Sequence, residues 1–261
     1  MSARHLHKTY RRRSTSMSWK KTSIAALNDV DLTIPSGAVV GLIGPSGSGK
    51  TTLARCIAGV ERPDSGEVWL AGKNLYSMSG AGFRELRRSI QLIFQDAAMA
   101  FNPRMTLEEI VAEPLRLGGS PPRQRRERSH DLLEQVGLLR QWSARHAAEL
   151  SGGQRQRVAI ARALAADPTV LILDESLSGL DLLTQTHVID LLLRLREATS
   201  ISYLFISHDL RLARRIATEI AVIHEGRIVE RGSTRELLAS PAHPCTRSLV
   251  DAMPSSIPGQ L

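Results

Sequence analysis

The stretch GPSGSGKTT, residues 44–52, combines glycine, lysine and hydroxyl side chains in a spacing that suits phosphate binding. It fits the pattern G-x-x-x-x-G-K-[ST], follows the apolar run Ala38–Gly44 and opens the helical pattern KTTLARCIAG. Glycines let backbone N–H groups wrap around phosphates, Lys50 can reach the β- and γ-phosphates, and the Thr51 hydroxyl can bind Mg²⁺. A plain strand–turn–helix is the alternative, but it needs neither side chain. We therefore predict a phosphate loop made of Gly44, Pro45, Ser46, Gly47, Ser48, Gly49, Lys50, Thr51 and Thr52.

Two adjacent carboxylates end the apolar stretch TVLILDE, residues 169–175. Beside a phosphate loop, Asp174 is placed to hold Mg²⁺, and Glu175 to position or polarise a water that attacks the γ-phosphate. Without that loop the pair would be read as solvated acids at a strand end. Together the two motifs predict a nucleotide triphosphatase.

A second glycine pair, Gly152-Gly153, opens another helical pattern in ELSGGQRQRVAIARAL, residues 149–164. Nothing in the pattern of that helix requires glycine there, and a glycine-rich helix start is a typical phosphate site. The alternative is an ordinary helix start with Ser151 as the N-cap residue. One chain thus carries two stretches suited to phosphate.

Strand and helix patterns alternate along the chain. Apolar strand patterns cover residues 38–44, 170–173 and 203–206, and helical patterns cover 152–166, 182–197 and 210–217. Strand signals vanish between about residues 102 and 150, where two helical patterns stand instead. This predicts an α/β fold of the P-loop NTPase class, with a mostly parallel central sheet, an N-terminal antiparallel β part and a helical subdomain inserted at about residues 102–165.

Composition narrows the class of protein. The chain has 261 residues, is 42% apolar and carries a formal net charge of +8. Its basic residues are spread and not interleaved with aromatic residues, so a membrane-proximal surface is favoured over nucleic-acid binding. Two distant cysteines, Cys56 and Cys245, predict neither a disulfide nor a zinc site. The basic, polar N-terminal residues predict no signal peptide, and the longest apolar runs are of strand length.

The stretch LSGGQ, shortly before LILDE, resembles the signature of the ATP-binding cassette (ABC) family. The resemblance covers nearly the whole chain and implies one ABC ATPase domain over residues 1–253, with a RecA-like core and a short tail at 254–261. In that family the signature acts on the ATP of a partner cassette that faces it head to tail. The resemblance thus implies that four residues contact the partner's ATP: Ser151, Gly152, Gly153 and Gln154.

Other motifs of the family occur at the expected places in the sequence. By resemblance, Gln95 in LIFQD binds Mg²⁺ and senses the γ-phosphate, and His208 in LFISHDL is the switch histidine that orients Glu175 or the water. The stretch SGLD, which contains Asp181, resembles the loop that contacts the partner cassette, although Gly179 departs from the usual residue there. Tyr10 in HKTY resembles the aromatic residue that stacks on adenine, with Trp19 as a competitor.

Within the family, three stretches resemble the ATPase subunits of peptide and nickel importers: FQDAAMAFNPRMTLEEIVAEPLRL, SHDLRLARRIA and HPCTRSLVDAMP. Ala97 and Cys245 replace a usual proline and a usual aromatic residue. The resemblance implies ATP and Mg²⁺ as ligands and a place on the cytoplasmic face of the inner (plasma) membrane. It implies as partners two transmembrane permeases, a second identical or different ABC ATPase subunit and, indirectly, an extracytoplasmic substrate-binding protein, but no nucleic acid.

Two rival functions remain open. A soluble ABC ATPase acting on nucleic acid or ribosomes usually joins two cassettes in one chain or inserts a long coiled coil, and this chain has one cassette with a modest insertion. An unrelated P-loop kinase has no reason to carry LSGGQ.

Overall fold

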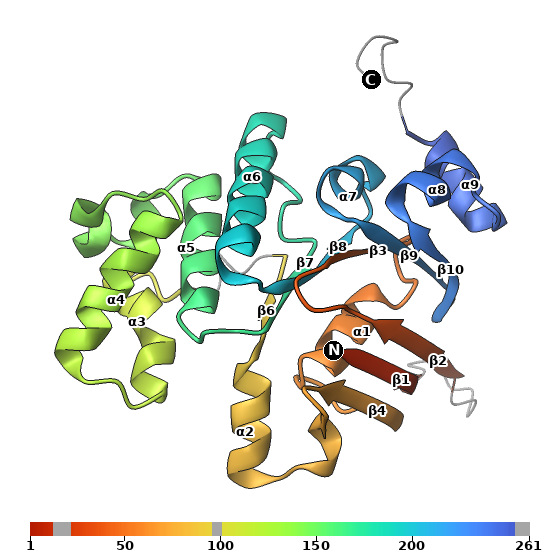
Figure 1. Ribbon diagram of the computed structural model, residues 1–261, viewed down its shortest axis with the longest axis horizontal. Coiled ribbons are helices and arrows are strands. Elements are labelled where there is room, and N and C mark those ends of the chain that lie inside the picture. Colours follow the sequence, from red (N-terminus) through yellow and green to blue (C-terminus); the bar gives the residue numbers. More distant parts are fainter. Residues whose placement is uncertain (13–21, 96–100, 254–261) are drawn as a thin grey trace, which may run out of the picture.

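The computed structural model describes residues 1–12, 22–95 and 101–253. Two β-sheets and a set of helices make up these residues, with one group of helices standing away from the antiparallel sheet (Figure 1). Trp19, Ala97 and the expected tail at 254–261 lie outside the described residues.

The central sheet contains six strands in the order β10-β9-β3-β8-β7-β6. Their bounds are β3 (Val39–Ile43), β6 (Ile90–Ile93), β7 (Val170–Asp174), β8 (Ser202–Ser207), β9 (Glu219–His224) and β10 (Arg227–Ser233). All neighbouring pairs are parallel except β9 and β10. The prediction of a mostly parallel sheet is confirmed.

The inner strands are apolar at almost every position because both faces of the sheet are covered. Leu171 and Leu173 of β7 belong to one buried cluster, which they share with residues of the helices that cover that face. Ile172, between them, belongs to a second cluster on the opposite face. This division follows the two-residue period of a strand.

An antiparallel sheet lies beyond the second cluster, in the order β2-β1-β4-β5. Its strands are β1 (Ser2–Arg12), β2 (Thr22–Thr33), β4 (Ser65–Leu70) and β5 (Lys73–Asn74). Helix α1 (Lys50–Ile57) contributes Leu53 and Ile57 to the cluster that also contains Leu6 of β1 and Leu42 of β3. The expected N-terminal antiparallel part therefore packs over the helix that follows the phosphate loop.

A helical lobe is formed by α3 (Leu107–Leu117), α4 (Pro122–Gln135), the short helices η2 (Arg140–Ala144) and η3 (Ala147–Glu149), and α5 (Gly152–Leu164). In Figure 1 α3 and α4 lie on the far side of α5 from α6 (Leu182–Thr199). A capping box, in which Thr106 and Glu109 bond each other's backbone N–H, starts α3. The helical patterns of this region are thus confirmed as helices.

The remaining helices flank the sheet and complete the chain: η1 (Leu75–Ser77), α2 (Gly80–Arg88), α7 (Leu210–Ile216), α8 (Thr234–Ala239) and α9 (Pro244–Asp251). Both cysteines are free. Within the described ranges, no helix is long and apolar enough to cross a membrane.

The sequence patterns missed two elements near the N-terminus. Strand β1 has register shifts against β2 between Ala3 and Thr9, and these bulges obscure its alternation. Helix α2 begins with GAG, which is typical of a turn, and buries only Leu86. Neither element shows the clean period on which such predictions depend.

Candidate functional site

Four predicted site segments follow parallel strands that end at the same edge of the central sheet. The phosphate loop follows β3, Gln95 follows β6, Asp174 ends β7 and His208 follows β8. The register pairs the last residue of β3 with the last residue of β8, and the last residue of β7 with the penultimate residue of β8. Ligands bind outside the carboxyl ends of strands in open α/β sheets, so this edge is the candidate site.

Two glycines of the phosphate loop are packed too closely for any side chain. A Cβ atom on Gly44 would collide with the carbonyl oxygen of Ile223, and one on Gly49 with that of Ala26. Gly49 also has a φ of 109°, which L-residues rarely adopt. The loop is therefore held between β9 and β2 in a fixed shape.

The Ser48 hydroxyl oxygen is buried in this loop and has no hydrogen-bond partner within the described part of the chain. A buried polar atom is normally bonded, so an unpaired one needs an explanation. A phosphate oxygen is a partner of suitable chemistry for this hydroxyl.

The Lys50 ammonium is buried, with 5% of the residue exposed. Its Nζ donates to the carbonyl oxygens of Gly44 at 2.8 Å and Pro45 at 2.9 Å, and lies 3.8 Å from Oε1 of Glu175. Burial lowers the pKa of Lys50, and the carboxylates of Glu175 and Asp174 oppose that shift. The two hydrogen-bond acceptors of Lys50 are uncharged carbonyl oxygens, so this buried cation is well placed to bind an anion.

Thr51 and Asp174 bring two oxygen atoms together at this edge. The Thr51 hydroxyl donates to Oδ1 of Asp174 over 3.3 Å. Burial raises the pKa of Asp174 and the charge of Glu175 adds to that shift, while the Thr51 hydrogen bond opposes it. Mg²⁺ prefers oxygen ligands and would favour the ionised carboxylate, so this donor pair fits the predicted metal.

Glu175 stands between a lysine and a histidine. Its Oε2 lies 3.4 Å from Nδ1 of His208, while its other oxygen faces Lys50. The backbone of Glu175 has a φ of 46°, in the left-handed region. Such a conformation costs about 1–3 kcal/mol and persists where the surroundings hold it. Here the Glu175 N–H donates to the carbonyl oxygen of Ile206 at 3.0 Å.

Gln95 is exposed in the turn after β6, next to the exposed Phe94. Since the last residue of β6 pairs with the penultimate residue of β7, Gln95 leaves the sheet beside Asp174. Its role as an Mg²⁺ ligand remains a prediction.

Tyr10 lies near the end of β1 and is 38% exposed. Its hydroxyl donates to Oε2 of Glu61 at 2.7 Å. Burial and that hydrogen bond raise the pKa of Tyr10, while a side-chain hydrogen bond with Thr52 lowers it. The Thr52 contact brings Tyr10 to the first turn of α1, as a base-stacking role requires.

Ser151 is the N-cap residue of α5, so the structural role considered for it is real. Its hydroxyl accepts from the Gln154 N–H at 3.3 Å, and Oε1 of Gln154 accepts from the Ser151 N–H at 3.0 Å. Ser151 is exposed, and the first two helical residues are Gly152 and Gly153. N–H groups at these positions have no partner within a helix. In Figure 1 α5 and α1 lie well apart, so the two glycine-rich helix starts are separate in this chain.

One sequence interpretation was wrong: Gly153 does have a structural need for glycine. A Cβ atom there would collide with Cγ2 of Thr184 on α6, whereas one on Gly152 would lie 3.3 Å from the end of the Leu180 side chain. Thr184 is itself bonded to Asp181, the N-cap of α6, through its N–H at 2.9 Å and its hydroxyl at 2.6 Å. The signature turn, residues 151–154, therefore lies against Leu180 of the SGLD loop and against Thr184, which bonds Asp181 of that loop.

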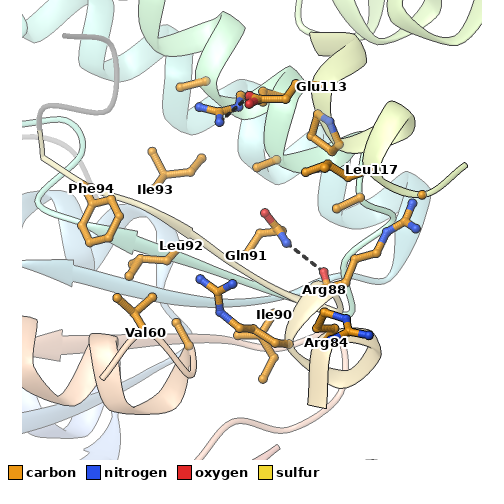
Figure 2. A pocket seen from close by; sticks show the side chains of 18 of the residues that line it. Val60, Arg84, Arg88, Ile90, Gln91, Leu92, Ile93, Phe94, Glu113 and Leu117 are labelled. Carbon is orange, nitrogen blue, oxygen red and sulfur yellow. Dashed lines mark hydrogen bonds and ion pairs between the residues drawn. The ribbon is translucent and has the colours of Figure 1, made fainter. Parts of the chain in front are cut away.

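A groove of about 780 Å³ lies where α2, β6, α3 and α5 meet. Figure 2 shows Phe94 and Leu117 on its wall and Arg84 and Arg88 on the side formed by α2. Phe94 is 39% exposed and Leu117 is 80% exposed. Large exposed apolar side chains around a hollow are typical of a surface that binds another protein.

Comparison with known proteins decides the family. Residues 27–178 match the ABC transporter family. This chain belongs to that family. It is 39% identical over 258 residues to the oligopeptide transport ATP-binding protein OppD of Mycobacterium bovis, over 98% of this chain and 42% of that protein. This ABC chain thus spans less than half the length of that relative.

Other relatives match a larger share of their own length. A putative peptide import ATP-binding protein of Brucella abortus is 41% identical, over 88% of this chain and 70% of that protein. The oligopeptide transport ATP-binding protein OppF of Lactococcus lactis is 40% identical, over 89% of this chain and 73% of that protein. The resemblance to peptide importers seen in the sequence agrees with these names.

Two solved structures share the fold. The dimeric ATP-binding cassette MJ0796 bound to ADP and Pi has a TM-score of 0.77 and 31% identity, over 90% of this chain and 99% of that chain. The protein cbiO1 of Clostridium perfringens, part of the ABC transporter complex cbiONQ, has a TM-score of 0.78 and 28% identity, over 92% of this chain and 90% of that chain. The expected fold class is confirmed.

Proposed function

We propose that this ABC chain is the ATP-hydrolysing subunit of a peptide importer. One observation carries the ATP-hydrolysing part of the proposal. Lys50, the Thr51–Asp174 pair and the Glu175–His208 pair meet at one edge of the sheet, linked by the contacts of 2.8–3.8 Å given above. Residues 1–253 then form one ABC ATPase domain with its helical subdomain at about 102–165.

The chemistry follows from these residues. Lys50 exchanges its two carbonyl partners for β- and γ-phosphate oxygens of ATP, and the loop N–H groups and the Ser48 hydroxyl bond further oxygens. Mg²⁺ would be held by Thr51, Asp174 and Gln95. When bound, it would neutralise negative charge on the phosphates. Glu175 accepts a proton from water as the water oxygen bonds the γ-phosphorus, the bond from that phosphorus to the β–γ bridging oxygen breaks, and ADP leaves. His208 contacts the γ-phosphate and holds Glu175 in position.

The signature turn, Ser151–Gln154, is proposed to serve a second cassette. The exposed start of α5 presents N–H groups, the Ser151 hydroxyl and a positive helix end, all suited to the γ-phosphate of a facing chain. The dimeric state of the similar cassette MJ0796 supports this arrangement. Asp181 would lie at the same interface, since Thr184 joins it to the signature turn.

The groove beside α2 and α3 is the proposed contact with two transmembrane permeases. Its apolar wall and arginine-rich side suit an amphipathic segment with acidic residues. Such contacts would place the chain on the cytoplasmic face of the inner (plasma) membrane. An extracytoplasmic binding protein would deliver the substrate, and nucleic acid has no part in this scheme.

Peptides are the preferred substrate because the similar proteins are named for oligopeptide transport or peptide import. Nickel or a metal chelate is the second candidate, and it rests only on the sequence resemblance. A soluble ABC ATPase that acts on nucleic acid or ribosomes is the alternative to import.

Purification from gently solubilised native membranes tests the proposal. We expect two permeases and a second cassette to copurify with this chain. Leu117→Glu should lose the permeases and keep ATP binding, because Leu117 lies on the groove and outside the nucleotide site. Leu139→Glu is the matched control, since Leu139 is 53% exposed and does not line the groove. Recovery of this chain without permeases, or equal losses in both variants, would contradict the proposal.

A further inference from the structure

Glu61 lies outside the phosphate chemistry proposed above, yet its carboxylate accepts a hydrogen bond from the tip of Tyr10. The two residues are 51 positions apart, and the Tyr10 hydroxyl donates to Oε2 of Glu61 at 2.7 Å. Glu61 lies in the turn after α1, and its N–H donates to the carbonyl oxygen of Arg55 in the last turn of that helix at 3.2 Å. A carboxylate fixed to the end of α1 thus holds an aromatic ring that comes from β1.

Lys8 completes this arrangement. Its Nζ lies 3.3 Å from Oε1 of Glu61, which leaves the other oxygen for Tyr10. The same ammonium donates to the carbonyl oxygen of Arg62 at 2.8 Å and lies 5.7 Å from the centroid of the Tyr10 ring. The side chains of Lys8 and Glu61 are only 15% and 23% exposed, so their ion pair is shielded from water. Tyr10 is therefore held at its hydroxyl and beside its ring.

We propose that Glu61, with Lys8, is a positioning residue that fixes the Tyr10 ring for stacking on the nucleotide base. This proposal rests on the proposed function, in which Tyr10 contacts adenine. A tyrosine near a strand end would otherwise lose rotamer freedom when the base binds. Anchoring the hydroxyl in advance removes that cost, which corresponds to about a three- to tenfold change in affinity.

The direction in which Glu61→Ala changes ATP affinity distinguishes a positioning role from a purely electrostatic one. ATP is a polyanion, so removal of a nearby carboxylate would by itself strengthen binding. Positioning predicts the opposite: Glu61→Ala weakens ATP binding. Inorganic triphosphate carries the phosphates without the base, so its affinity should not fall in the same variant.

The test measures the affinity of the full chain for ATP and for inorganic triphosphate by calorimetry. We expect Glu61→Ala to raise the Kd for ATP about three- to tenfold and not to raise the Kd for triphosphate. In a Tyr10→Phe background, which keeps the ring and lacks the hydroxyl, Glu61→Ala should add little further loss. The exposed Glu67→Ala is the control for charge, and it should not weaken ATP binding.

The outcomes are distinct. Equal loss of ATP and triphosphate affinity in Glu61→Ala, an unchanged Kd for ATP, or an undiminished loss in the Tyr10→Phe background would each overturn the positioning role. Tyr10→Ala without loss of ATP affinity would overturn it as well. Failure of the proposed nucleotide site would show elsewhere, as triphosphate binding that persists unchanged in Lys50→Ala.

Discussion

The phosphate loop and the signature turn both place glycines at the start of a helix, but they differ in what surrounds them. At the phosphate loop, Gly44 and Gly49 are pressed against carbonyl oxygens of neighbouring strands, and Lys50 is buried. At the signature turn, Gly153 is buried against Thr184, but Ser151 is exposed, and a Cβ atom on Gly152 would meet only the end of the Leu180 side chain, at 3.3 Å. One start is enclosed by its own chain, and the other faces outward.

This difference indicates two kinds of phosphate contact. An enclosed loop with a buried cation can bind a polyanion without help from another molecule. An open helix start offers only N–H groups and a hydroxyl, and needs a second surface to exclude water from them. The first is thus suited to hold ATP, and the second to contact ATP that another cassette already holds.

The largest expected effect concerns the chemistry on the enclosed side. Glu175→Gln removes the proton acceptor while Lys50 and the loop remain, so hydrolysis should fall about 10²- to 10⁴-fold. ATP affinity should change little. Steady-state phosphate release and equilibrium ATP binding measure the two quantities, with the surface variant Glu134→Gln as control. A normal hydrolysis rate would transfer the role of base from Glu175, with His208 as the next candidate.

A smaller effect is expected from packing on the open side. Gly153→Ala places a Cβ atom against Cγ2 of Thr184, and such overpacking costs about 1–3 kcal/mol in the free energy of unfolding. Gly152→Ala is the matched control and should cost less. In the Gly153→Ala background, Thr184→Ser removes the clashing methyl group and keeps the hydroxyl that bonds Asp181. It should therefore restore much of the lost free energy of unfolding. Denaturant unfolding of wild type, the Gly152→Ala, Gly153→Ala and Thr184→Ser single variants and the double variant measures these free energies. If Gly153→Ala costs as much in the presence of Thr184→Ser as in its absence, the contact between residue 153 and Cγ2 of Thr184 is contradicted.

The smallest effect concerns the pH dependence of stability on the enclosed side. Burial raises the pKa of Asp174 in the folded chain, so the ionised carboxylate lowers the free energy of unfolding at neutral pH. This loss of stability disappears as the pH falls through the raised pKa of Asp174 in the folded chain to below the ordinary pKa of an aspartate in the unfolded chain. Asp174→Asn should therefore be more stable than wild type at neutral pH without Mg²⁺ and ATP, and the difference should shrink towards acid. Lower stability of the variant at neutral pH would contradict this account.

Sequence reasoning indicated which residues lie together where their placement depends on short, fixed spacing. Lys50 and Thr51 follow their glycines directly, and Asp174 and Glu175 end an apolar strand, so strand and helix geometry alone bring them to the sheet edge. The helices of the lobe were predicted because their patterns are local, whereas β1 of the antiparallel sheet was missed because its register shifts obscure the alternation.

It could not find pairs that depend on tertiary packing. Glu61 meets Tyr10 across 51 residues, and no pattern near Glu61 indicates it. Thr184 likewise gave no signal, and for that reason the need for glycine at Gly153 was missed. The roles of all the candidate site residues in contacting ATP, Mg²⁺ or the attacking water remain predictions.

One measurement tests the central claim, that the enclosed loop holds this chain's ATP and the open turn serves another's. Gly152→Asp suits it because a Cβ atom there would meet only the end of the Leu180 side chain, at 3.3 Å, and an acidic residue favours a helix start, so we expect the fold to be retained. Its charge would oppose a γ-phosphate that approaches α5. The isolated variant should bind ATP like wild type, whereas Lys50→Ala should not, and ATP hydrolysis by the assembled transporter should fall at least about tenfold. Loss of ATP binding by the isolated, folded Gly152→Asp chain would contradict the claim, because both loops would then belong to one pocket.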